Sequence, residues 1–268
     1  IQADQVEEAM KYIKENDEIK SNISFERKDL TPNNEIRLNI IYNDENIIVV
    51  NKPAGIQVHP DNNERKNTLA NALLSKFPEI KDVHDEALGS YLRPGIVHRL
   101  DKDTSGVMIA ARNQKTFNEL KEMFQERKIN KKYVALLYGQ IKDKKGIITK
   151  AIARAGNYRK QTVAGAKTKT KVRGAVTEYK QLKRFNEYSL IEAHPLTGRM
   201  HQIRIHFFSI GHPVVGDKLY KIKSIKENCL AKRQLLHAER IDFTLFGKKF
   251  SFSAPLPEDF NVFLKNID

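Results

Sequence analysis

The segment from His98 to Gly106 holds the densest group of side chains that could do chemistry. It reads His-Arg-Leu-Asp-Lys-Asp-Thr-Ser-Gly and comes directly before the apolar run 107–111. Asp101 is therefore expected in a turn that feeds a rigid strand, which is a common setting for a site residue. The same pattern also fits a polar turn whose aspartate caps its own backbone. On these residues alone, both interpretations stay open.

The chain carries a strong positive charge that is unevenly distributed. Lys+Arg 47 against Asp+Glu 33 gives a net charge of +14 over 268 residues. Residues 144–184 contain 13 basic side chains and one acidic side chain, whereas residues 1–46 contain 11 acidic and 6 basic ones. A basic face of this kind suits a polyanion held through phosphate contacts. A solvated, lysine-rich surface is the alternative.

Composition argues against several classes of protein. The longest apolar runs have only the length of a strand, so we expect no membrane partner. We find no phosphate loop, dinucleotide fingerprint or metal cluster, and we therefore expect no cofactor and no bound metal. The single cysteine, Cys229, cannot form an internal disulfide, and this favours a reducing compartment: the cytoplasm, or an organellar matrix in a eukaryote.

The first half of the chain contains the elements expected to position Asp101. A hairpin is predicted over residues 38–51, with a polar turn at 43–46. Thr68 begins one predicted helix, residues 107–111 form a buried strand, and Asn113 caps a second helix.

The second half is rich in predicted strands. Strands are expected at 133–138, 146–154, 172–182, 188–193, 235–245 and 249–252, with a helix over 199–209 and a closing helix from Pro257. Hairpins mixed with helices predict an α+β fold, a largely antiparallel mixed sheet with flanking helices. We assign residues 37–268 to this main domain. Residues 1–36 are interpreted as an N-terminal helical appendage, with an amphipathic helix over 3–16.

Four stretches carry a resemblance to a known family, and they occur in that family's order. They are residues 44–60 with Asn-Lys-Pro-Ala-Gly at 51–55, the segment 98–106, Lys-Lys-Tyr-Val-Ala at 131–135, and Leu-Thr-Gly-Arg-Met-His-Gln-Ile-Arg-Ile-His at 196–206, which continues to 217. Together they resemble the motifs of the RluA-type pseudouridine synthases, over about residues 40 to 255. The resemblance implies the pseudouridine synthase fold, with loops that bind RNA, and an isomerase that acts on uridine in RNA without a cofactor. Many members of this family carry an N-terminal RNA-binding domain, so the resemblance also allows residues 1–36 to be the remnant of a trimmed RNA-binding domain.

The resemblance also implies three catalytic residues. Asp101 matches the family's catalytic aspartate, which acts at the ribose carbon either as a nucleophile or by stabilising positive charge. Arg204 matches the arginine that pairs with this aspartate; otherwise it would be a surface residue of an amphipathic helix. Tyr133 matches the active-site tyrosine, whose ring can stack on uracil and whose hydroxyl can take part in proton transfer. Whether this hydroxyl is the base is left open.

Further residues are expected to contact RNA. Arg99 matches a residue that can fill the gap left by a flipped-out base, although a simple phosphate contact fits equally well. Arg199 and His201 are expected to support the substrate or neighbouring loops, and His98 is expected to shape the turn. We interpret residues 158–173 as a mobile basic loop that grips the RNA backbone.

Two other functions are weighed against the isomerase. His98, Asp101 and Asp103 could supply ligands for a metal-dependent nuclease, although no further acidic motif completes the set. A non-catalytic RNA-binding protein would have the same charge but would not need Asp101, Tyr133 and Arg204. For the isomerase, ribosomal RNA is the first expected partner and transfer RNA the second, and the protein is expected to be a monomer.

Overall fold

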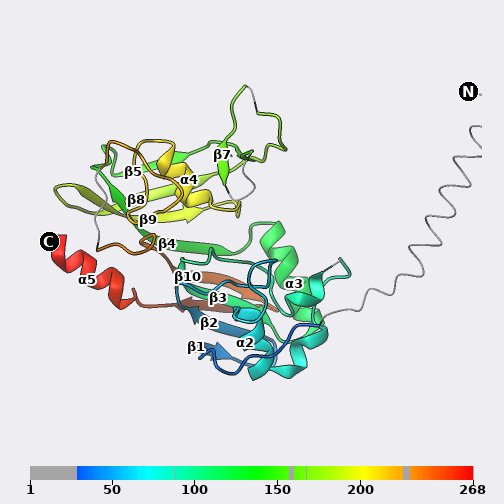
Figure 1. Cartoon of the computed structure of the whole chain (residues 1–268). Coiled ribbons are helices and arrows are strands. Elements are labelled where there is room, and N and C mark those ends of the chain that lie inside the picture. Colours follow the sequence, from blue (N-terminus) through cyan, green and yellow to red (C-terminus); the bar gives the residue numbers. More distant parts are fainter. Residues whose placement is uncertain (1–28, 88, 157–159, 167, 226–229, 268) are drawn as a thin grey trace, which may run out of the picture.

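The computed structural model describes residues 29–87, 89–156, 160–166, 168–225 and 230–267 (Figure 1). Nine strands form one mixed, mostly antiparallel sheet in the order β1-β2-β3-β10-β4-β9-β8-β5, and β11 pairs with β10. These strands are β1 (Ile40–Asn43), β2 (Ile47–Lys52), β3 (Ser105–Ala111), β4 (Asn130–Tyr138), β5 (Lys145–Ile148), β8 (Thr177–Arg184), β9 (Tyr188–Pro195), β10 (Leu236–Leu245) and β11 (Lys248–Ser253). A separate two-stranded sheet pairs β6 (Ile152–Arg154) with β7 (Gln161–Val163).

Within the described residues, four α-helices lie beside the large sheet (Figure 1). They are α2 (Leu69–Lys76), α3 (Gln114–Gln125), α4 (Gln202–Phe208) and α5 (Glu258–Ile267), and short 3₁₀ helices span Pro78–Asp82 and Ser90–Leu92. Thr68 caps α2 by accepting from the backbone N–H of Asn71, and Asn113 caps α3 by accepting from that of Thr116, as predicted. The α+β class is confirmed.

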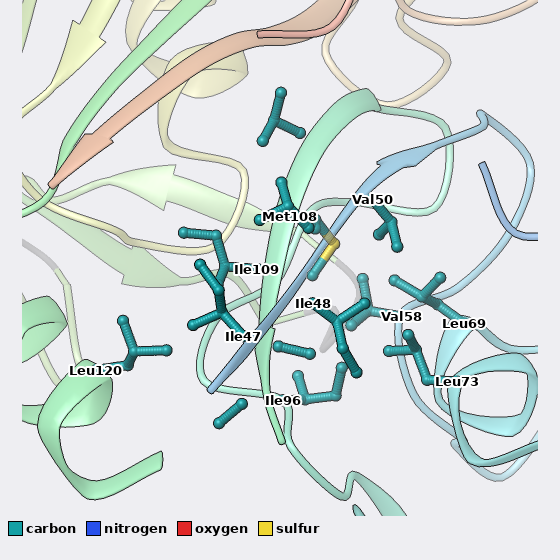
Figure 2. Close-up of a cluster of buried hydrophobic side chains, with 14 of the residues drawn as sticks. Ile47, Ile48, Val50, Val58, Leu69, Leu73, Ile96, Met108, Ile109 and Leu120 are labelled. Atoms are coloured by element: carbon teal, nitrogen blue, oxygen red, sulfur yellow. The ribbon is translucent and has the colours of Figure 1, made fainter. Parts of the chain in front are cut away.

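The core of the first half lies on both faces of β2 and β3. Every residue of β3 is buried. Figure 2 shows Ile47 and Ile109 on the side of Leu120 in α3, and Ile48 on the side of Leu69 in α2. A strand that is covered on both faces reads as a continuous apolar run, which is why 107–111 shows no polar alternation. The turn that contains Asp101 is therefore attached to a rigid strand.

Gly106 allows β3 to approach β10 closely. β3 runs parallel to β10, with Ser105 opposite His237 and Gly106 opposite Ala238. Gly106 has a φ of 120°, and a Cβ at this position would lie 2.1 Å from the carbonyl oxygen of Ala238. Only glycine fits this approach without displacing the backbone. The contact joins the first half of the sheet to β10, and β4 pairs with the other edge of β10.

Several predicted boundaries were wrong. The strand expected over 146–154 is divided into β5 and β6, because residues 149–151 lead from the large sheet to the small one and Lys150 accepts a hydrogen bond from His206 through its carbonyl oxygen. The strand expected from 172 begins at Thr177, and the segment 158–173, interpreted as a loop, contains β7. The helix expected from Arg199 begins at Gln202, because His201 adopts a left-handed conformation with φ of 57°.

The N-terminal predictions fall mostly outside the described residues, as does Cys229. This holds for the helix predicted over 3–16. Within the proposed appendage, Leu30 is buried in the core of the first half, and the backbone N–H of Asn33 donates to Asn71 in α2. The boundary at residue 37 stays a prediction. In the described part of the chain, we find no helix with the length and apolar character needed to cross a membrane.

Candidate active site

Arg204 joins two carboxylates at the centre of the site. Its Nη1 donates to Oδ2 of Asp101 at 2.8 Å, while its Nε and Nη2 donate to the two oxygens of Asp217 at 2.6 and 2.9 Å. The Arg204 side chain is only 4% exposed, so it is not the surface residue of the alternative interpretation. Burial alone would lower the pKa of Arg204, but the hydrogen bonds and charges of Asp217 and Asp101 outweigh it and raise this pKa. The guanidinium is therefore permanently charged and held in a fixed orientation.

Asp217 is a site residue that the sequence analysis missed. Its side chain is fully buried, and its Oδ1 also accepts the backbone N–H groups of Leu219 and Tyr220 at 2.8 and 3.1 Å. Asp217 ends the motif that begins at Leu196, and this position was a signal that it belongs to the site. A buried carboxylate needs a charged or hydrogen-bonding partner, and the same motif contains Arg204. The bidentate pair with Asp217 uses Nε and Nη2 of Arg204, and Nη1 donates to Asp101.

The turn that carries Asp101 is tied down by a buried lysine. Lys52, at the end of β2, is fully buried, and its Nζ donates to the carbonyl oxygens of Pro53, Ile56 and Lys102 at 2.8, 2.8 and 2.9 Å. Burial lowers the pKa of Lys52 to about 7, and the charges of Asp103 and Asp101 act in the opposite direction. Three carbonyl acceptors match the three N–H bonds of an ammonium group. Lys52 thus links the loop after β2 to the residue that follows Asp101.

The two carboxylate oxygens of Asp101 differ in their hydrogen bonding. Oδ2 accepts from Arg204, whereas Oδ1 accepts no hydrogen bond from any residue within the described ranges. Nε2 of His201 lies 3.9 Å from Oδ1, which is too far for a hydrogen bond. The Asp101 side chain is 18% exposed. A partly exposed carboxylate with a free oxygen can act on a group that enters the site.

Tyr133 lies in the middle of the sheet, where β4 runs between β10 and β9. It stands opposite Ala238 on one side and Ala193 on the other. Burial and the charge of Asp101 raise the pKa of Tyr133 above its ordinary value. At neutral pH its hydroxyl is therefore protonated and can donate or accept a hydrogen bond, but it is not a phenolate.

One cleft of about 870 Å³ collects all six predicted site residues. It is lined by Arg99, Asp101, Tyr133, Arg199, His201 and Arg204, together with the turn between α3 and β4. Arg99 is exposed at this cleft, and Arg199 donates through Nε to the carbonyl oxygen of Gly174 at 3.1 Å. The turn between α3 and β4 adds the basic side chains Arg127 and Lys128, and the start of β4 adds Lys131. A cleft with a carboxylate at its centre and basic side chains along it can hold a polyanion near a reactive oxygen.

His98 is used for structure. Its Nε2 accepts the backbone N–H of Ile109 at 2.9 Å, and its ring stacks on Phe124 with 4.6 Å between centroids. Burial, with a smaller effect of Lys131, lowers the pKa of His98 to about 3, so the ring is neutral at neutral pH. The nuclease alternative needs His98 and Asp101 as metal ligands. In this structure Nε2 of His98 is used by the backbone N–H of Ile109, and Asp101 is paired with Arg204. Across the described part of the chain, no group of three or more His, Cys, Asp or Glu side chains is arranged to hold a metal ion.

Comparison with known proteins gives one consistent result. A family profile described as RNA pseudouridylate synthase matches residues 46–209. An uncharacterized RNA pseudouridine synthase of Aquifex aeolicus is 47% identical over 198 residues, which cover 73% of this chain and 60% of that protein. Ribosomal large subunit pseudouridine synthase D of Borreliella burgdorferi is 38% identical over 241 residues, or 89% of this chain and 71% of that protein.

A solved structure agrees with the sequence relatives. Human RNA Pseudouridylate Synthase Domain Containing 1 superposes with a TM-score of 0.68 at 25% identity, over 88% of this chain and 96% of that one. The matched family region contains Asp101, Tyr133 and Arg204, while Asp217 lies just beyond it.

Proposed function

The chain belongs to the RNA pseudouridylate synthase family, and from this premise we propose that it isomerises uridine in RNA to pseudouridine with Asp101 as its catalytic carboxylate. The observation that carries the proposal is the pairing of Asp101 with Arg204 inside a basic cleft. Arg204 holds one carboxylate oxygen and leaves the other open to the cleft. This is the arrangement that a carboxylate needs when it must meet a ribose carbon.

Uridine and pseudouridine have the same composition, so the reaction adds and removes no group. The bond between C1′ of the ribose and N1 of uracil breaks, the base turns, and C1′ bonds to C5, which loses its proton while N1 gains one. Asp101 supports this step either as a nucleophile at C1′ or by stabilising the positive charge that develops there. Arg204 keeps the carboxylate ionised and directed. Tyr133, with its protonated hydroxyl and its ring at the cleft, is suited to stack on the base and to exchange a proton near C5.

The target base must leave its stack to reach Asp101. A base inside a helix cannot present its sugar carbon to a carboxylate at the centre of a cleft, so the nucleotide is flipped out. Arg99 is exposed at this cleft, and we propose that it fills the vacated position or contacts a phosphate. Arg199 and His201 line the same cleft and are proposed to contact the RNA.

Large-subunit ribosomal RNA is the proposed substrate. The support is the printed name of the Borreliella burgdorferi relative, and a ribosomal large subunit pseudouridine synthase D of Pseudomonas aeruginosa is 37% identical over 238 residues. This chain spans 60% of the Aquifex aeolicus relative and 71% of the Borreliella one, so those proteins contain sequence without a counterpart here. Transfer RNA is the second candidate. We further propose that the protein acts as a monomer in the cytoplasm.

Tritium release tests the function directly. RNA labelled with tritium at C5 of uridine is offered without metal or cofactor to the wild-type protein and to Asp101→Asn, using ribosomal and transfer RNA from cells that lack the gene. We expect the wild type to release tritium from ribosomal RNA and Asp101→Asn to release none. Release that stops when EDTA is added would contradict the proposal, and so would equal release by both proteins. Release from transfer RNA alone would keep the chemistry and replace the substrate.

A further inference from the structure

Tyr220 lies behind the site and contacts three of its parts at once. It is 3% exposed and follows Asp217 by three residues, and its backbone N–H donates to Asp217. Its ring lies under the guanidinium of Arg204, 5.3 Å from Cζ to the ring centroid. Its hydroxyl lies 2.9 Å from Nδ1 of His201. The proposed chemistry gives Tyr220 no role, although it touches two residues that flank Asp101.

The hydrogen bonds of the Tyr220 hydroxyl determine where its proton lies. The backbone N–H of Gln161 donates to this oxygen at 2.9 Å. The hydroxyl has a single proton to donate, and among the residues that the structure describes the acceptor within reach is Nδ1 of His201. Burial raises the pKa of Tyr220 to about 12, so the hydroxyl keeps its proton at neutral pH. The tyrosine is thus the donor and the histidine nitrogen is the acceptor.

A histidine that accepts at Nδ1 must carry its proton on Nε2 when it is neutral. Burial lowers the pKa of His201, and so do the charges of Arg204 and Arg99, whereas Asp101 and Asp217 raise it; the net direction is down. The ring is therefore neutral, and its single N–H is the one that faces Oδ1 of Asp101 at 3.9 Å. The left-handed backbone of His201 holds the ring in this position before α4 begins.

We propose that Tyr220 is a positioning residue for Asp101: its hydroxyl fixes the Nε2–H form of His201 and so directs an N–H donor at the carboxylate oxygen that Arg204 leaves free. The distance of 3.9 Å closes when the substrate enters, since catalytic hydrogen bonds are often long in the unbound state. The donor then restrains the reactive oxygen without taking its charge, because a neutral imidazole cannot protonate a carboxylate.

The same hydroxyl connects the site to the small sheet. Gln161 begins β7, and Val163 of β7 packs against a cluster that contains Tyr220 and Ile205. The segment interpreted as an RNA grip thus supplies the N–H that orients the Tyr220 hydroxyl. Movement of β7 on RNA would be transmitted through two hydrogen bonds to the donor beside Asp101.

The test replaces Tyr220 with phenylalanine, which keeps the ring and removes only the hydroxyl. Tyr42→Phe is the matched control, because its hydroxyl donates one 2.9 Å hydrogen bond to Asp44 and Tyr42 is not among the residues of the cleft. We expect Tyr220→Phe to lower the single-turnover rate on saturating RNA about tenfold, the effect of one neutral hydrogen bond, and to change the RNA dissociation constant less than about twofold. Tyr42→Phe should leave both unchanged.

A spectroscopic measurement separates positioning from a merely structural role. Long-range proton–nitrogen NMR of the full chain labelled with ¹⁵N-histidine, assigned with His201→Gln, should show His201 protonated at Nε2 in the wild type and a mixture of forms in Tyr220→Phe. A wild-type His201 protonated at Nδ1, or a rate loss in Tyr220→Phe without a change of form, would overturn the inference. The double variant His201→Gln/Tyr220→Phe should have the same rate as His201→Gln alone, because glutamine has no imidazole ring whose proton the Tyr220 hydroxyl could position.

The rate measurement in this test rests on the proposed function, whereas the NMR measurement does not. Absence of isomerase activity in the wild type would refute the proposed function, whereas the protonation of His201 tests the link to Tyr220 whatever the reaction is.

Discussion

Asp217→Asn is the perturbation that tests the buried charge arrangement most directly. Oδ2 of Asp217 accepts Nε of Arg204 at 2.6 Å, and Oδ1 accepts the other three donors. An asparagine that keeps its oxygen at the Oδ1 position must place its NH₂ group against Nε, so that two donors face each other in a fully buried site. Breaking a buried ion pair by removing one partner costs about 3–5 kcal/mol. We expect a decrease of this size in the free energy of unfolding.

Urea unfolding followed by far-ultraviolet circular dichroism provides the measurement, since the chain has no tryptophan to report by fluorescence. Asp242→Asn is the control: Asp242 pairs with Nε of Arg240 at 2.8 Å, but Arg240 is 47% exposed and the pair should be worth less than about 1 kcal/mol. If both variants lost the same small amount, the claim that Asp217 holds Arg204 as a buried charge partner would be refuted. Under native conditions Asp217→Asn should also lose isomerase activity, because Arg204 is no longer fixed beside Asp101.

Three further predictions concern the supports of the site. Lys52→Met removes three hydrogen bonds; the carbonyl of Lys102 keeps the backbone N–H of Gly55, whereas those of Pro53 and Ile56 lose their lysine donor, and the protein should be destabilised by about 3 kcal/mol in urea unfolding. Gly106→Ala places a Cβ 2.1 Å from a carbonyl oxygen and should cost about 3 kcal/mol or more, seen as a lower melting temperature by calorimetry. The pKa of His98 is about 3 in the folded protein and about 6.5 in the unfolded chain, so the unfolded chain binds more protons between these two pH values. The neutral His98 therefore contributes its full stabilisation above pH 6.5, and this stabilisation is lost as the pH falls. At pH 5 the free energy of unfolding should be about 2 kcal/mol lower because of His98. Urea unfolding at pH 5 and pH 7 should show that His98→Phe removes most of this contribution.

Local patterns in the sequence were sufficient for the class of fold and for most elements of the large sheet. The run 107–111 and the caps Thr68 and Asn113 each depend on neighbouring residues, and such signals can be read from sequence alone. Boundaries that depend on tertiary contacts could not be read. The division of 146–154 follows from the hydrogen bond between Lys150 and His206, two residues that are far apart in the chain.

The site was predicted in part, for a related reason. The motifs identified Asp101, Tyr133 and Arg204, which line one cleft, although their catalytic roles stay proposals. Asp217 ends the longest family motif, which was a signal for its importance, but the sequence does not show that its carboxylate faces Arg204, thirteen residues earlier. Tyr220 was missed because a tyrosine in a loop carries no signal by itself. Its hydrogen bonds to His201 and Gln161 exist only in the folded chain.

The place of β10 in the sheet has a consequence for how the protein is made. β10 lies between β3 and β4, so it separates the strand that follows Asp101 from the strand that carries Tyr133, yet its residues 236–245 come after both of these strands in the chain. A nascent chain that has left the ribosome only to residue 230 already contains Asp101, Tyr133, Arg204 and Asp217 but lacks the strand that sets the two halves beside each other. Pairing over such sequence separation forms slowly and late. The cleft can therefore assemble only after β10 has left the ribosome, and a nascent chain that lacks residues 236–245 should be unable to modify RNA.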